Sequence, residues 1–497
     1  MDYKDATPQE IDNAMQQAWE AFLQYRKCTL KQRADLMRTI AAELEALGDE
    51  VIHRAMEETH LPEGRLKGER ARTIFQLNNY AAAAEKGDWL EARIDTAIPD
   101  RASGPKPDLR KMLVPLGPVV VFGASNFPFA YSTAGGDTAC AFAAGCPVIV
   151  KAHPAHAGTS EMVAQTILRA AEKCGMPKGI FAHIHGAGFE TGRLLVEHPL
   201  TKAVGFTGSL AGGKALFDLA ARRREPIPVF AEMGSINPVF LLPDKLQQDA
   251  ESIAKMYAAS ITQGVGQFCT NPGLIVGIEG EALQKFINIL GEEIRQVAPA
   301  TMLHPGIAKG YVEKRTLALA QQEVHTQAVS LHHAEENQGA PTLATASGEA
   351  FLNNPVLHQE VFGPYSLVIR CKDAAQMLDI IRRIEGQLTS TLMATDADAA
   401  AHSEIFEAVR DICGRLIMNG VPTGVEVCLA MQHGGPFPAT TDSRFTSVGA
   451  DGIKRFARPL CLQNVPDHLL PDELKNANPL HIWRTVNDEL TQSAVRL

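Results

Sequence analysis

One cysteine in a glycine-flanked loop is the residue of this chain best suited to covalent chemistry. Cys269 lies within residues 264–273, which read GVGQFCTNPG, and follows a run with helical spacing at 253–263. Glycine lets the backbone bend tightly and approach a ligand closely, so a thiol in such a loop can meet a reacting atom. Free cysteine is more often a small buried hydrophobe, so the nucleophile hypothesis depends on what else the chain carries.

Four further motifs carry the side chains that a nucleophilic thiol would need. Asn126 lies in the stretch FGASNFPF, after the apolar run 119–121, and Glu232 lies in the stretch AEMGSINP. Residues 206–213 read FTGSLAGG, and residues 360–364 read EVFGP. Each motif alone has an ordinary explanation, because asparagine caps loops, glutamate is mostly exposed and glycine-rich helix starts are common. The occurrence of all these motifs in one chain, in a set order, is more specific than any single motif.

These five motifs, in this order, resemble the aldehyde dehydrogenase superfamily over nearly the whole chain. Residues 123–129 and 268–273 are most similar to the branch that holds α-ketoglutaric semialdehyde dehydrogenases and a bacterial fatty-aldehyde dehydrogenase. The resemblance implies NAD(P)-dependent oxidation of an aldehyde to a carboxylic acid through a cysteine thiohemiacetal and thioester. α-Ketoglutaric semialdehyde, which gives 2-oxoglutarate, is the expected substrate, and a fatty or other aliphatic aldehyde is the alternative.

The resemblance implies the roles of three catalytic residues. Cys269 matches the nucleophile, which adds to the aldehyde carbon. The side-chain amide of Asn126 and the backbone N–H of Cys269 match the donors to the resulting oxyanion, and one such donor lowers a barrier by about 3 kcal/mol. Glu232 matches the general base, which activates the water that hydrolyses the thioester.

Cofactor contacts are implied in the same way. Glu360 matches the residue that binds the nicotinamide ribose, and Phe362 the one that packs beside it. Lys151 matches the lysine that reaches the adenosine ribose. Gly208 and Ser209 would present backbone N–H groups at a helix start to the pyrophosphate. The expected cofactor set is completed by Ser125, Pro154, Arg193 and Gly213.

One departure from the family pattern bears on the choice of cofactor. Members that prefer NAD usually hold a glutamate three residues beyond the lysine, and here that position is Pro154. Without this carboxylate, and with Lys151, His153 and Arg193 nearby in the resembling scheme, a 2′-phosphate has room. NADP is therefore predicted over NAD. If His153 is only an ordinary polar loop residue, either cofactor can bind.

The expected substrate tunnel is apolar. Its walls are matched by aromatic residues and one threonine, namely Phe127, Tyr131, Phe268 and Thr270. A substrate that carries a carboxylate needs a cationic partner in such a tunnel, and Arg72 and Arg444 are the candidates. Taken singly, either arginine is equally well explained as a surface or packing residue.

The elements that must position these residues alternate between strands and helices. Amphipathic helices are predicted at 8–25 and 31–47. Short apolar runs separated by helical segments then predict a parallel sheet with crossover helices, at 119–121, 148–150, 180–184, 203–206 and 229–230. A second βα pattern includes 274–277, 365–369, 389–394 and 415–418. The standard G-x-G-x-x-G fingerprint is missing, as it characteristically is in the resembling family.

The predicted fold class is α/β, with a Rossmann-like cofactor domain, an α/β catalytic domain and a small β-flap for oligomerisation. The cofactor domain is expected at 1–92 and 116–234, and the catalytic domain at 235–454. By resemblance, residues 93–115 and 455–497 form the flap and tail, in a homodimer or homotetramer.

Composition excludes several partners. Acidic residues outnumber basic ones, 57 to 47, and the only notable basic run is 222–224, which argues against nucleic acid and anionic membranes. The longest apolar stretch, 139–150, is interrupted by glycine and proline, so no membrane span is predicted. An acidic amino terminus is not a signal peptide. Nine cysteines without paired spacing indicate reduced thiols, a cytoplasmic location and no metal motif.

Other classes of protein remain as alternatives. A cysteine-dependent hydrolase could use Cys269 with Glu232 and Asn126, but it would have no use for nucleotide contacts such as Lys151 and Glu360. A catalytically silent relative would not need all three catalytic side chains. A coenzyme-A-acylating relative is disfavoured because Glu232 is present to activate water.

Overall fold

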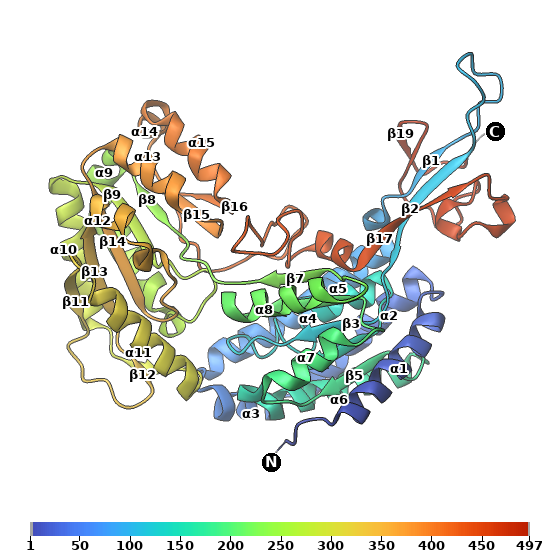
Figure 1. The fold of residues 1–497 in the computed structure, drawn as a ribbon, viewed down its shortest axis with the longest axis horizontal. Coiled ribbons are helices and arrows are strands. Elements are labelled where there is room, and N and C mark those ends of the chain that lie inside the picture. The colour runs from blue at the N-terminus through green and yellow to red at the C-terminus, as the bar shows by residue number, and fades with distance from the viewer. Residues whose placement is uncertain (1–2, 496–497) are drawn as a thin grey trace.

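The computed structural model describes residues 3–495, which form two α/β lobes and a β-flap that projects from one of them (Figure 1). The chain opens with two helices, α1 (Pro8–Tyr25) and α2 (Leu30–Ala46), each preceded by a threonine. Thr7 and Thr29 each form a capping box, in which the threonine and the third helical residue satisfy each other's backbone N–H groups. Two further helices follow, α3 (Glu50–Thr59) and α4 (Glu63–Lys86).

The first lobe is built on a five-stranded parallel sheet in the order β5-β4-β3-β6-β7. Its strands are β3 (Val119–Phe122), β4 (Val148–Lys151), β5 (Phe181–Ile184), β6 (Ala203–Thr207) and β7 (Val229–Glu232). The helices between them are α5 (Gly136–Ala144), α6 (Ala157–Lys173), α7 (Phe189–Glu197) and α8 (Leu210–Arg222). This is the alternation of strands and crossover helices that the apolar runs predicted.

The second lobe holds a seven-stranded sheet in the order β11-β13-β14-β9-β8-β15-β16. All neighbours are parallel except β11 and β13. Its strands are β8 (Val239–Leu241), β9 (Leu274–Ile278), β11 (His325–Val329), β13 (Thr342–Ser347), β14 (Tyr365–Cys371), β15 (Gln387–Met393) and β16 (Cys413–Met418). Its helices are α9 (Pro243–Thr262), α10 (Glu281–Gln296), α11 (Pro305–Leu319), α12 (Gly348–Asn353), α13 (Ala374–Arg383), α14 (Asp396–Ala401) and α15 (Ser403–Asp411). A two-stranded ladder pairs β10 (Ala300–Thr301) with β12 (Gln338–Gly339).

The flap is a five-stranded sheet built from two distant parts of the chain, in the order β17-β2-β1-β18-β19. Its strands are β1 (Arg93–Asp95), β2 (Leu109–Pro115), β17 (Ala457–Gln463), β18 (Arg484–Val486) and β19 (Glu489–Thr491). Figure 1 shows this sheet extending away from the body of the first lobe.

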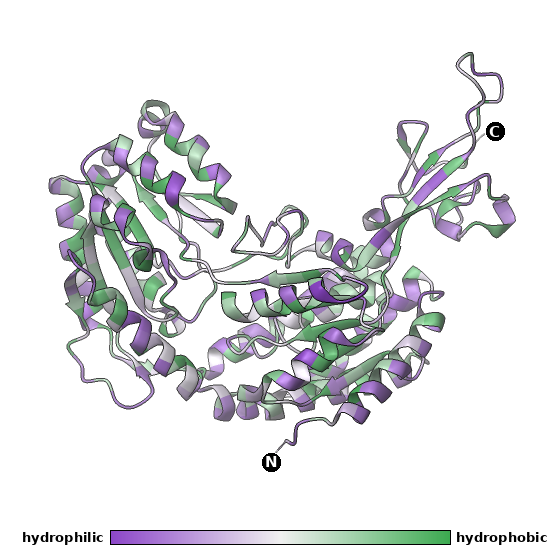
Figure 2. Ribbon diagram, viewed as in Figure 1, coloured by the Kyte–Doolittle hydropathy of each residue, from purple (hydrophilic) through white to green (hydrophobic). Residues whose placement is uncertain are grey.

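The two large sheets are hydrophobic inside and their helices are hydrophilic outside (Figure 2). Every residue of β8 and of β15 is buried, as expected of strands covered by helices on both faces. The predicted α/β fold class is therefore confirmed. None of the helices within residues 3–495 combines the length and the apolar character that crossing a membrane requires.

Candidate active site

Glycine residues let the cysteine loop pack closely against a neighbouring loop. Cys269 follows α9 and a short 3₁₀ turn, Gln263–Gly266. Gly266 has a positive φ of 63°, and a Cβ there would run into the backbone carbonyl of Gly363. Only glycine therefore lets the loop at 264–273 pack directly against the loop at 360–364.

The thiol of Cys269 lies beside a buried histidine and a buried glutamate. Its Sγ is 3.7 Å from His433 Nε2, and the same Nε2 is 3.2 Å from Glu232 Oε1. Glu232 ends strand β7 and is 3% exposed. Ser447 donates its hydroxyl to the other carboxylate oxygen of Glu232 at 2.8 Å. Cys269, His433 and Glu232 thus form one chain of contacting groups, of which the histidine and the glutamate are buried.

Burial and charge set opposite protonation states for this pair. Burial raises the pKa of the Cys269 thiol well above its usual range, and the adjacent Glu232 carboxylate raises it further. Burial also raises the pKa of Glu232, but attraction to His433 and hydrogen bonds from Ser447 and Cys269 outweigh it and lower the pKa overall. At neutral pH the resting site holds a thiol and a carboxylate.

Asn126 and the cysteine loop are fixed by amide contacts. The Asn126 side chain donates to the carbonyl of Gln267 at 3.2 Å, two residues before the nucleophile candidate. Asn237 donates its side-chain amide to the carbonyls of Cys269 and Asn271, both at 2.9 Å. The structure therefore brings Asn126, Glu232 and Cys269 to one place.

The expected tunnel walls form an aromatic cluster. Phe127 makes edge-to-face contacts with Phe268 and Tyr131, with ring centroids 5.6 and 5.3 Å apart. Thr270 is buried behind them. Arg72 reaches this cluster, with its guanidinium 3.4 Å from the Tyr131 hydroxyl and 5.7 Å from the ring centroid.

The other arginine proposed for a substrate carboxylate lies elsewhere. Within the described residues, Arg444 is exposed and contacts Asp442 and the ring of Phe445 rather than the groups around Cys269. A side chain already paired with a carboxylate in water has little reason to hold a buried one. Of the two candidates, only Arg72 stands in the aromatic cluster.

Sequence reasoning missed four residues of this site. His433 and Ser447 contact Glu232, as described above. Arg65 lies over the rings of Phe268 and Phe127, 4.7 and 5.1 Å from their centroids, and donates to the carbonyl of Asn126 at 2.7 Å. Arg415 binds the carbonyls of Gly424 and Pro422, and its charge interacts with Cys269 and Tyr131.

His433 could have been recognised from its sequence context. His433 opens the stretch HGGPFP, which has the small-residue character that singled out Cys269. Sequence alone does not show that this stretch returns to the first lobe, where Met233 N–H donates to the carbonyl of Ala439. Arg65 lies within a long helix among other charged residues and carried no such signal.

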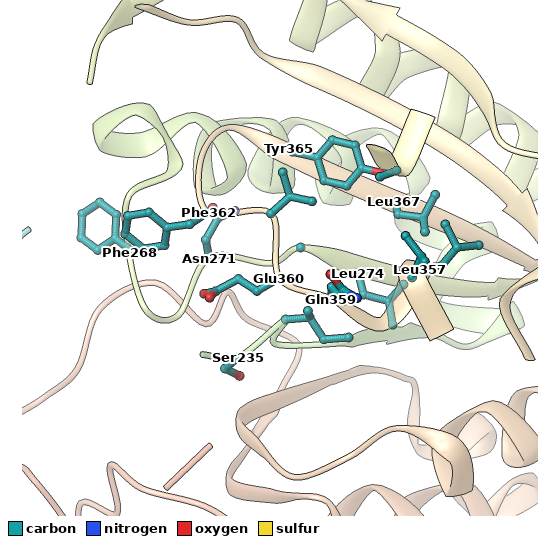
Figure 3. Close-up of a pocket in the computed structure, with 15 residues that line it drawn as sticks. Ser235, Phe268, Asn271, Leu274, Leu357, Gln359, Glu360, Phe362, Tyr365 and Leu367 are labelled. Carbon is teal, nitrogen blue, oxygen red and sulfur yellow. The ribbon is translucent and has the colours of Figure 1, made fainter. Parts of the chain in front are cut away.

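The nicotinamide end of the expected cofactor site is lined by Glu360 and Phe362. Figure 3 shows both on a loop near Phe268 and Asn271, with Ser235 on the facing segment. A Cβ at Gly234 would meet Glu360 Oε2 at 2.8 Å, so glycine gives the carboxylate its place. Burial raises the pKa of Glu360 to about 7.

Lys151 and three histidines lie together at the expected adenosine end. Lys151 ends strand β4, and burial lowers its pKa, opposed by the charge of Asp5. The ring of His153 lies 6.0 Å from that of His304 and 5.5 Å from that of His156. Burial, with these neighbours and Lys151, lowers the pKa of His153. Pro154 is exposed at the start of the next turn.

The start of α8, where the pyrophosphate is expected, is exposed. Gly208 and Ser209 are exposed, and Ser209 Oγ caps the helix by accepting from Gly212 N–H at 3.2 Å. Gly213 packs against Met233, where a Cβ would come within 2.7 Å of the sulfur. Ser125 is partly exposed after β3. Arg193, in contrast, is exposed and bound to Glu190 and Glu197.

Comparisons with known proteins agree with one another. Residues 1–437 match the model of the aldehyde dehydrogenase family. The α-ketoglutaric semialdehyde dehydrogenase of Acinetobacter baylyi is 47% identical over 99% of this chain and 93% of its own length. Alpha-ketoglutaric semialdehyde dehydrogenase 2 of Azospirillum brasilense is also 47% identical, over 96% of this chain and 91% of its own.

Solved structures share the fold at low sequence identity. A putative aldehyde dehydrogenase from Burkholderia cenocepacia superposes with a TM-score of 0.77 and 19% identity, covering 93% of both chains. A 1-pyrroline-5-carboxylate dehydrogenase from Thermus, solved with bound NAD, superposes with a TM-score of 0.76 and 21% identity, covering 92% of this chain and 86% of its own.

Proposed function

This chain belongs to the aldehyde dehydrogenase family, and from that premise we propose that it oxidises α-ketoglutaric semialdehyde to 2-oxoglutarate at Cys269. Family membership makes it an NAD(P)-dependent enzyme acting on an aldehyde. The choice of semialdehyde is supported by the two relatives at 47% identity, both named for that substrate. The catalytic part of the proposal is carried by one observation, the contact of the Cys269 thiol with the buried pair His433 and Glu232.

The first step is activation of the thiol. Because its pKa is raised, Cys269 must lose a proton before or as it attacks. His433 Nε2, 3.7 Å away, accepts that proton in the tautomer that carries its hydrogen on Nδ1, and the adjacent Glu232 carboxylate stabilises the resulting imidazolium. The sulfur then bonds to the aldehyde carbon, and the carbonyl oxygen becomes an oxyanion. The Asn126 amide and the Cys269 backbone N–H donate to that oxygen.

The second half of the reaction releases the acid. Bound NAD(P) supplies the acceptor for the hydride that leaves the former aldehyde carbon. A thioester on Cys269 remains, and a water molecule must attack it. Glu232, held as a carboxylate, takes a proton from this water, and the carbon–sulfur bond breaks to give the carboxylic acid and the thiol.

NADP is the cofactor we propose over NAD. Lys151 supplies positive charge at the adenosine end, the rings of His153 and His304 can donate N–H hydrogen bonds to a 2′-phosphate, and Pro154 supplies no opposing carboxylate. Asp5 is the acidic residue whose charge bears on Lys151, so the preference is expected to be moderate.

A buried carboxylate on the substrate needs a cation, and Arg72 is the residue we propose for it. Its Nε is buried without a hydrogen-bond partner, beside the aromatic cluster next to Cys269. An incoming carboxylate would satisfy that donor and avoid an unpaired charge in an apolar tunnel.

The test is a panel of aldehydes assayed for reduced-cofactor absorbance, with NAD and NADP in parallel. α-Ketoglutaric semialdehyde should give the highest kcat/KM, and Cys269→Ala should abolish turnover while cofactor binding persists. If long-chain uncharged aldehydes give the higher kcat/KM, the protein is a fatty-aldehyde dehydrogenase instead. Ester hydrolysis without cofactor at a comparable rate would instead favour the hydrolase.

A further inference from the structure

A second cluster of side chains with metal-ligating atoms lies at the edge strand of the five-stranded sheet, outside the catalytic site. His183 belongs to β5, and His185 follows two residues later. Glu161, on α6, places Oε2 3.0 Å from His183 Nδ1 and 3.0 Å from His185 Nε2. The three ligand atoms all lie within 4.8 Å of one another.

The spacing follows from the fold. Alternate residues of a strand point to the same side, so the two histidines face the same covering helix. The ligands of a tetrahedral Zn²⁺ with bonds of about 2.0 Å lie about 3.3 Å from one another. The two nitrogen–oxygen distances of 3.0 Å are a few tenths of an ångström shorter, which small side-chain rotations can open.

The ligand atoms are also held from behind. Metal-binding histidines usually use their second ring nitrogen in a hydrogen bond that fixes the ring. His183 Nε2 lies 2.8 Å from Ser160 Oγ, which in turn lies 2.5 Å from Thr133 Oγ1. Tyr3 stacks on the His185 ring at 4.3 Å. Gln165 donates to the second oxygen of Glu161 at 2.8 Å, leaving Oε2 to face the histidines.

The site is also open to an incoming ion. Hydrogen bonds now join the Glu161 oxygen to the two ring nitrogens, and a bound metal would take the place of the protons between them. The Glu161 side chain is 34% exposed, which leaves an approach from solvent.

We propose that His183, His185 and Glu161 form a site for a divalent transition-metal ion, with Zn²⁺ as the best match to two nitrogens and one carboxylate oxygen. Water would fill the remaining position. The ion would join α6 to β5 and, through the Tyr3 stack and the hydrogen bond from Ala6 N–H to the His185 carbonyl, to the amino-terminal segment. Its role is to stabilise this edge of the lobe, away from the reacting atoms.

The test must separate this cluster from the catalytic one, because Glu232, Cys269 and His433 also lie close enough together to bind a metal. We would therefore use full-length Cys269→Ala protein stripped with a chelator, and titrate it with ZnCl₂ by calorimetry. One Zn²⁺ per chain should bind, and the melting temperature should rise with Zn²⁺ concentration.

Four variants in that background complete the test. Glu161→Gln and His185→Asn should each weaken Zn²⁺ binding at least tenfold and remove the rise in melting temperature, while His333→Ala, an exposed histidine, should change neither. Ser160→Ala, which removes only the support of His183, should weaken binding less than the ligand variants do. Unchanged Zn²⁺ affinity in folded Glu161→Gln and His185→Asn proteins, or no binding in the parent, would overturn the proposal.

Discussion

His433 lies between the Cys269 thiol and the Glu232 carboxylate. One base can therefore take the proton of the thiol while the other takes the proton of the hydrolytic water. His433 Nε2 faces both Cys269 Sγ and Glu232 Oε1, so the imidazole is placed to receive the thiol proton. The carboxylate accepts a hydrogen bond from Ser447 and stays ionised. Acylation and hydrolysis are therefore expected to depend on different side chains.

Glu232→Gln tests this division. The variant should form the thioester, giving one burst of reduced cofactor per active site, and then stall because the water lacks its base. Rapid mixing with excess aldehyde measures the burst and the steady state separately. As a comparison, His433→Asn should slow the burst itself, by about 10²-fold to 10⁴-fold. Steady turnover by Glu232→Gln at the wild-type rate would show that Glu232 is not the base.

Arg72 gives the prediction on substrate choice. Hydrogen bonds to charged groups contribute about 1.5–3 kcal/mol, so Arg72→Ala should lower kcat/KM for the semialdehyde about tenfold to a hundredfold. The loss should lie mainly in KM, because the arginine binds ground state and transition state alike. An uncharged aldehyde of equal length should be little affected, and Arg444→Ala is the matched control. Equal losses for both aldehydes would make Arg72 a packing residue.

At the residue scale, sequence could find what lies in a recognisable motif. Cys269, Asn126 and Glu232 each come with a characteristic glycine or proline nearby, so their types and order were readable. His433 and Arg65 act through contacts between segments far apart in the chain, and no spacing in the sequence reports such contacts. Arg444 was a candidate because of its residue type, but residue type does not predict which side chain an arginine contacts.

At the scale of elements, the apolar runs predicted the first sheet well and left out three strands of the seven-stranded sheet. The five runs expected in the first half correspond to β3 to β7, within one or two residues at each end. β8 is only three residues long and was not recognised after Pro238. β13 reads TLATAS, and β11 is largely exposed, so neither shows a continuous apolar run. Their burial or pairing comes from tertiary contacts.

The packing of two loops gives a prediction about Gly266. A side chain there would collide with the backbone of Gly363, and its φ of 63° disfavours other residues. Gly266→Ala should therefore destabilise the fold by about 1–3 kcal/mol and sharply lower activity, because it moves Cys269 against the loop that carries Glu360. Gly310→Ala, in helix α11 with open space around its Cβ, should be neutral or slightly stabilising. Urea unfolding of both variants tests this, and equal stability would contradict it.

The loop after β4 carries the prediction on cofactor. Pro154→Glu places a carboxylate near Lys151 and His153, where a 2′-phosphate is proposed to bind. Repulsion in a partly desolvated site should weaken NADP by about 1–3 kcal/mol and spare NAD. Fluorescence titration of the two cofactors measures this directly. Equal losses would mean that the residue acts through loop shape, and no loss would place the phosphate elsewhere.

At the scale of the whole molecule, the active site is assembled from three parts of the chain. Glu232 ends the sheet of the first lobe, Cys269 lies on a loop of the second, and His433 comes from a segment that runs back from β16 to β7. That return places residues 433–447 against the first lobe, where Thr440 pairs with Glu232 and Ala439 accepts from Met233 N–H. The nine cysteines are all free thiols within the described residues.

The flap gives the prediction on assembly. Its sheet projects from the body and ends in the short edge strand β19, where Leu490 is 69% exposed (Figure 1). Exposed apolar residues on an edge strand indicate a surface that another chain covers. Leu469 and Trp483, also on the flap segment, are exposed as well. We therefore expect the protein to be a homodimer or homotetramer held together in part by the flap.

Light scattering after size exclusion tests this expectation on wild-type protein and two variants. Leu490→Asp should shift the mass toward that of a single chain, because a carboxylate buried at an interface without a partner is strongly unfavourable. Leu331→Asp is the matched control, since Leu331 is equally exposed, at 69%, but lies in the loop between β11 and β12 of the second lobe. A monomeric wild-type protein would contradict the prediction. An oligomer that Leu331→Asp disrupts and Leu490→Asp leaves intact would show that the contact lies outside the flap.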